Sequence, residues 1–134
     1  MMQTYTQYFY SFTSATITLR VIEHLRRNYQ STLDSVAVIN LIDSWLIKIN
    51  LKPSISIEST KNLQAFLNEM GSAYKPSIQI ARALARLEAG ESPTEIMNHY
   101  RLVIVAYGEP ETEEIELFRR EIIKRLGYCP QNLV

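Results

Sequence analysis

The side chains best suited to chemistry are few and lie far apart in the chain. His24 follows Glu23, and His99 has no acidic neighbour. Residues adjacent in sequence point to different faces of a helix, so neither histidine gains a partner this way. The histidines and the single cysteine, Cys129, lack the HxxxH, HxxE or CxxC spacing of a zinc site. There is no glycine-rich phosphate loop. We therefore predict no catalytic residues, metal, cofactor or small-molecule substrate.

The composition describes one ordinary domain of 134 residues, spanning 1–134. Hydrophobic residues make up 46% of the chain, with only 4 glycines and 5 prolines, so a folded core is expected. Fourteen basic residues balance fourteen acidic ones, which leaves no net field to attract nucleic acid or anionic lipid. A lone cysteine and the absence of a signal-like or membrane-spanning run predict a cytoplasmic protein.

Aromatic residues are concentrated near the N-terminus, in residues 1–14. We interpret this segment as an arm whose rings either dock on the domain itself or bind a protein partner or a second copy of the chain. The candidate partner-binding residues are Tyr5, Tyr8, Phe9, Tyr10 and Phe12.

The next two segments are both predicted to be helical. Apolar residues recur at four-residue spacing from Ala15 to Tyr29, although 15–21 also alternates as a strand would. A second helix is expected from Ser31 until Pro53 stops it. Its apolar residues cover more than one face, so it should be a central helix with Trp45 as a core anchor.

Three further helices have recognisable ends. One is expected to start at Ser59 or Thr60 and to close at Gly71. Another starts from the cap Ser77, and the last runs from Thr112 to the cap at Gly127. In the last helix acidic residues precede basic ones, the order that complements a helix dipole.

The chain is organised around the turn at Leu87–Met97. Gly90 suits the left-handed end of one helix, and Ser92 to Glu95 forms a capping box for the next. This predicts an α-hairpin or helix-turn-helix unit at 77–107. The second helix would run to about Tyr107, although 102–107 is apolar and β-branched and could instead be a buried strand.

The pattern Leu87-x-x-Gly90-x-Ser92-x-x-Glu95-Ile96 resembles the turn of bacterial helix-turn-helix regulators. The resemblance covers about ten residues and implies DNA binding by the second helix, with phosphate contacts from the first. The residues that would contact DNA are Arg82, Arg86, Thr94, Asn98, His99 and Arg101.

Together these patterns predict an all-α fold, a compact bundle of five to six short helices. The function expected is a non-catalytic protein–protein interaction module: a small regulatory, adaptor or assembly factor, or a subunit of a larger complex. Its partner would be another protein or a second copy, bound by the aromatic arm and by the exposed sides of the helices in 77–107. The alternative is a helix-turn-helix transcriptional regulator.

Overall fold

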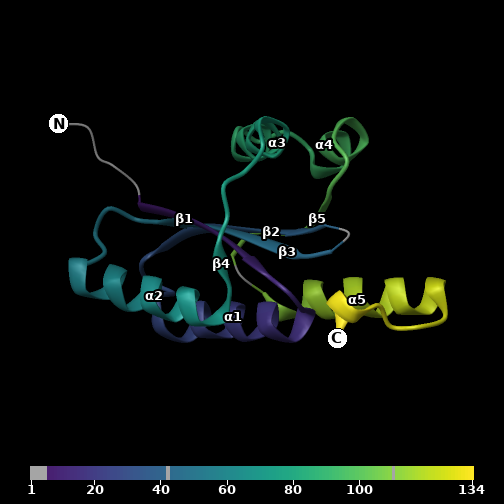
Figure 1. Ribbon diagram of the computed structural model, residues 1–134. Coiled ribbons are helices and arrows are strands. Elements are labelled where there is room, and N and C mark those ends of the chain that lie inside the picture. Colours follow the sequence, from purple (N-terminus) through teal and green to yellow (C-terminus); the bar gives the residue numbers. More distant parts are fainter. Residues whose placement is uncertain (1–5, 42, 110) are drawn as a thin grey trace.

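A five-stranded antiparallel sheet runs through the middle of the molecule, so the predicted all-α bundle is wrong and the fold is α+β (Figure 1). The computed structural model describes residues 6–41, 43–109 and 111–134. The strands lie in the order β4-β1-β3-β2-β5. In chain order the elements are β1 (Thr6–Phe12), α1 (Ala15–Asn28), β2 (Leu33–Asn40), β3 (Trp45–Leu51), α2 (Ile57–Met70), β4 (Ser72–Ala73), α3 (Ile78–Glu88), α4 (Pro93–His99), β5 (Val103–Gly108), α5 (Thr112–Leu126) and the 3₁₀ turn η1 (Gln131–Leu133).

Helices cover both faces of the sheet and create two separate cores (Figure 1). On one face α1, α2 and α5 enclose the larger core, in which Trp45 is fully buried as predicted. On the other face α3 and α4 enclose a smaller core. The buried residues of the smaller core are Ala37, Ile39, Leu46, Ala83, Leu84, Leu87, Ile96 and Leu102.

The N-terminal aromatic segment is a strand and not an arm, at least over the described part of it. β1 pairs with β3 along its whole length, from Thr6 opposite Leu51 to Phe12 opposite Trp45. Tyr8, Tyr10 and Phe12 recur at a period of two, which fits a pleated sheet, and Phe9 lies between them on the other face. Alternation places its side chains in turn on the two faces of the sheet.

The predicted central helix between Ser31 and Pro53 is a hairpin of two strands. β2 and β3 pair from Leu33 opposite Leu51 to Asn40 opposite Trp45. In the turn between them, the Leu41 N–H donates to the Ser44 carbonyl at 2.8 Å. Both strands lie between two layers of helices, so most residues on both of their faces are buried and apolar. A segment that is apolar on all sides fits a buried strand as well as a buried helix, and this is why the periodicity misled.

Helices with clear local signals are confirmed. Ser14 caps α1 by accepting from the Ile17 N–H at 3.2 Å, and the strand alternative for 15–21 is wrong. α2 lies inside the predicted range apart from its first turn, and Ser77 caps α3 as expected. Gly127 ends α5 in the left-handed conformation, with φ 77°.

The predicted hairpin at 77–107 is correct for α3 and for the start of α4, and wrong beyond it. Gly90 has φ 94°, and Pro93 is the first residue of α4, although Ser92 makes no side-chain capping bond. α4 has only 7 residues and stops at His99. The following segment is β5, the strand alternative, because its β-branched residues pair with β2 between the two cores.

Candidate functional site

The edge of the sheet formed by β5 is the most distinctive open surface among the described residues. β5 pairs with β2 on one side, and no described strand lies on its other side. Its sequence, Val103 to Gly108, contains no charged residue and no proline. At the opposite end of the sheet, part of β1 is paired with the short strand β4. The Tyr74 N–H, just after β4, also donates to the Phe9 carbonyl of β1 at 2.8 Å. We call the unpaired side of Val103–Gly108 the β5 edge.

The backbone groups of two residues define the β5 edge. The Ile104 N–H donates to Sδ of Met97 at 3.3 Å, so it does not point to β2. The pairing is irregular after Ile104, where Val105 is an extra residue without a partner on β2. Ile39 and Ala37, the β2 partners of Ile104 and Tyr107, lie two residues apart and so occupy equivalent positions in the ladder. Tyr107 therefore directs its N–H and C=O away from β2, as Ile104 does.

The side chains of the β5 edge are apolar and accessible. Val103 and Tyr107 are each 39% exposed. Ile104 packs against the smaller core, and Leu102 just before the strand is buried in it. At this end of the strand an open groove of about 750 Å³ is lined by residues of the β2–β3 turn, by Met97 and by Tyr100 to Val103. The β5 edge therefore combines backbone groups that are not paired with another strand and apolar contact area.

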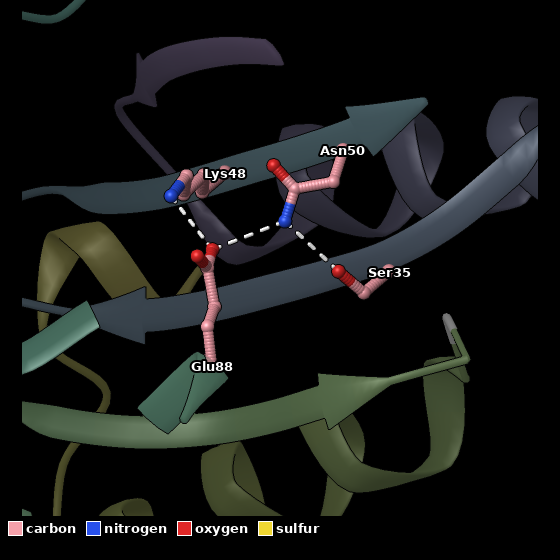
Figure 2. Close-up of polar contacts among 4 residues, drawn as sticks. All are labelled: Ser35, Lys48, Asn50 and Glu88. Atoms are coloured by element: carbon pink, nitrogen blue, oxygen red, sulfur yellow. Dashed lines mark hydrogen bonds and ion pairs between the residues drawn. The ribbon is translucent and has the colours of Figure 1, made fainter. Parts of the chain in front are cut away.

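A polar network connects the other end of β5 to the sheet and to α3 (Figure 2). Oε1 of Glu88, the last residue of α3, accepts from Nζ of Lys48 at 2.6 Å and from Nδ2 of Asn50 at 3.0 Å. Nδ2 of Asn50 also donates to Oγ of Ser35 at 2.9 Å. Tyr107 of the edge strand lies beside the network, since Glu88 and Ser35 both affect the pKa of its hydroxyl. Burial raises the pKa of Tyr107, and the nearby Glu88 carboxylate adds to the effect.

This network could not be found from the sequence. Lys48, Asn50 and Ser35 lie in the segment predicted as a helix, where they would have pointed in unrelated directions. On adjacent strands they share one face, and Glu88 reaches them from a helix about forty residues further along the chain.

The residues predicted to bind a partner through the aromatic arm are distributed over both faces of β1. Tyr10 and Phe12 are buried in the larger core, so a partner cannot reach their rings. Tyr8 is half-buried against the same core, and its hydroxyl donates to the Thr60 carbonyl at 3.3 Å. Phe9 packs on the opposite face beside Tyr74. Tyr5 lies outside the described residues.

The residues predicted to contact DNA stand on or next to the α3–α4 hairpin. Arg86 is engaged within the protein, because it pairs with Glu91 and lies 5.5 Å from the centre of the Tyr100 ring. Arg82 and Arg86 lie on α3, Thr94, Asn98 and His99 on α4, and Arg101 between α4 and β5. The exposed members of the set are Arg82, Thr94, Asn98, His99 and Arg101.

The histidines and the cysteine stand apart from one another. The His24 ring stacks on Phe66, with ring centres 3.7 Å apart, and burial lowers its pKa. His99 and Cys129 are exposed. Within residues 6–41, 43–109 and 111–134 there is no group of three His, Cys, Asp or Glu side chains that could hold a metal ion. Over the same residues, no helix has the length and apolar character needed to cross a membrane.

Comparison with known proteins supports the fold and adds nothing about function. No protein-family model and no curated protein matches the sequence. Among solved structures, the chain is similar to the crystal structure of the C-terminal domain of YpbH, with a TM-score of 0.53 and 15% sequence identity. The similarity covers 85% of this chain and 99% of that domain. At this identity it shows that the two chains share a fold.

Proposed function

We propose that this protein is a non-catalytic protein–protein interaction module that binds an extended protein segment along the β5 edge. The observation that carries the proposal is an open strand edge that is free of charge and of proline over Val103–Gly108. Proteins usually protect such an edge with lysine, proline or a covering segment, because an unpaired strand invites pairing by another chain. The β5 edge has an irregularity at Val105 but carries no lysine, proline or covering strand, so it is a suitable place for strand addition.

The chemistry of strand addition fits the groups present. An added strand satisfies backbone N–H and C=O groups, and apolar contacts at alternate positions supply specificity. On the β5 edge, Ile104 and Tyr107 provide the backbone groups, while Val103 and Tyr107 provide exposed apolar surface. The polar network around Glu88 links α3, β2 and β3 beside the edge.

Neighbouring features support the same class of function. The aromatic residues of β1 pack largely inside the protein, so the proposed contact surface is on β5 and not on β1. The exposed free cysteine, Cys129, supports a reducing compartment, and we propose the cytoplasm.

Photo-crosslinking in native cells tests the proposal. A photoreactive amino acid replaces Val103 or Tyr107 in separate variants, and the matched control carries it at Ile57, which is 77% exposed on α2 across the sheet. The probes at positions 103 and 107 should form adducts that mass spectrometry maps to one short segment of the bound chain. The probe at position 57 should form no adduct with that segment. Adducts that are equal at all three positions, or absent from 103 and 107, would contradict the proposal.

A further inference from the structure

We propose that the segment bound by the β5 edge is the β5 strand of a second copy of this chain, so that the two sheets join across a twofold axis. This inference rests on the proposed function, and it specifies the partner. Homodimers with twofold symmetry are the commonest assemblies, and an antiparallel strand pair has the symmetry they require.

The positions of the free backbone groups fit self-pairing. Ile104 and Tyr107 lie on either side of the irregularity at Val105, and both direct their N–H and C=O groups outward. In an antiparallel pair centred on the irregularity, Ile104 of each copy stands opposite Tyr107 of the other. The side chains of Ile104 and Tyr107 lie on the face of the sheet that carries α3 and α4. Their partners on β2, Ile39 and Ala37, both belong to the smaller core on that face. Opposed residues of an antiparallel pair share a face, and this pairing meets that condition.

The charges at the two ends of the strand select this arrangement. Arg101 precedes β5 and Glu109 follows it, and both are exposed. In this register Glu109 of one copy stands opposite Leu102 of the other, one residue along from Arg101, so two neighbouring pairs of opposite charge form in each dimer. Parallel pairing would set like charges side by side. Between these ends the strand carries no charge, so two copies meet without repulsion.

A charge-swap experiment tests the pairing directly. Arg101→Glu leaves carboxylates at both ends of β5, and Glu109→Arg leaves cations at both ends. Each variant alone should dimerise about tenfold more weakly than the natural chain, since two exposed pairs become repulsive. Mixing the two variants restores every opposite-charge contact, so the mixture should form a heterodimer with near-natural affinity. Sedimentation equilibrium over a concentration series measures the dimer affinity of each variant and of their mixture.

The control exchanges a charge pair of the same kind away from the edge. Arg86→Glu with Glu91→Arg alters a surface ion pair on the α3–α4 hairpin. These variants should dimerise like the natural chain. Circular dichroism of every variant confirms that a weakened dimer is folded and has not simply unfolded.

Hydrogen exchange locates the interface and separates this inference from the proposed function. The amides of Ile104 and Tyr107 should exchange more slowly as concentration rises, while amides on α2 should not change. A monomer of 15.5 kDa at all concentrations would overturn self-pairing, and so would a dimer that leaves these two amides unaffected. If the protein is monomeric but crosslinks from Val103 and Tyr107 reach another protein, self-pairing is wrong and the proposed function stands. If no chain is crosslinked either, both are wrong.

Discussion

The Ile104 N–H donates a hydrogen bond to the sulfur of Met97, 3.3 Å away, at the open edge of the sheet. A thioether is a weak acceptor, whereas the usual partner of a strand N–H is a carbonyl oxygen. Met97 belongs to α4, so the short helix provides the acceptor for a backbone group that the sheet does not pair. A neighbouring strand would offer a stronger acceptor and displace the sulfur.

Met97→Leu should expose this amide without disturbing the packing. Leucine has nearly the same volume as methionine and is tolerated in most cores, but it cannot accept a hydrogen bond. In dilute monomer, the Ile104 amide should therefore exchange several times faster in the variant than in the natural chain. Hydrogen exchange followed by NMR measures the rate.

The same variant has an internal control. Amides of β2, which are bonded within the sheet, should exchange at unchanged rates. Raising the protein concentration should restore protection of Ile104 if a second strand covers the edge. Equal exchange of Ile104 in the two proteins would show that the sulfur contact has no effect.

Glu88→Ala should destabilise the fold more than loss of a surface ion pair would suggest. Glu88 accepts from Lys48 and from Asn50, which is only 7% exposed. Removing the carboxylate leaves a buried amide with one partner fewer, at a cost of about 1–3 kcal/mol. Glu91→Ala, which breaks the exposed pair with Arg86, should cost clearly less, because solvent weakens an exposed ion pair. Urea denaturation measures both, and equal costs would contradict the structural role of the network.

The sequence predicted the elements whose signals are local. Ser14 and Ser77 accept from the N–H three residues later, and Gly127 closes its helix with a positive φ. Each of these interactions lies within a few residues of its own helix, so the residue type identifies the helix end without any knowledge of the rest of the chain. The start of α3 and the end of α5 were predicted in this way, whereas α1 was predicted from the spacing of its apolar residues.

The sheet was missed because its stabilising contacts are between distant segments. β1 pairs with β3 across about forty residues, and β5 pairs with β2 across more than sixty. Leu33–Asn40 and Val103–Gly108 are apolar on both sides because helices cover both faces of the sheet, and that pattern does not distinguish strand from helix. The candidate site depends on this pairing, so the free edge of β5 could not be identified before the strand order was known.

Gly71→Ala should be one of the most disruptive small substitutions in the chain. The backbone of Gly71 is extended, with φ −161°, so alanine meets no conformational strain there. Its methyl group, however, would collide with the Ser11 carbonyl oxygen and approach the Phe12 ring to 2.6 Å. Both belong to a strand held in the sheet, so the cost should be about 3 kcal/mol, at the upper end for overpacking.

Gly90→Ala is the matched control for that substitution. Gly90 has a left-handed φ of 94°, but nothing lies within 4 Å of an added methyl group. The expected cost is the backbone term alone, about 1 kcal/mol. Thermal and urea denaturation give both values. A larger loss for Gly90→Ala than for Gly71→Ala would show that backbone conformation outweighs the close contact between α2 and β1.

His24 should make the stability depend on pH in the mildly acidic range. Burial against Phe66 lowers the pKa of His24, so the folded protein binds the proton less tightly than the unfolded chain does. The contribution of neutral His24 to the free energy of unfolding is therefore complete above about pH 6.5, the ordinary pKa of histidine. It is lost as the pH falls through the lowered pKa of the folded protein. His24→Phe keeps a ring on Phe66 and cannot be protonated, so its free energy of unfolding should fall less between about pH 7.5 and about pH 5. An NMR titration of the imidazole checks the direction independently: a midpoint at or above the ordinary value, or parallel pH profiles for the two proteins, would show that protonating this ring costs the fold nothing.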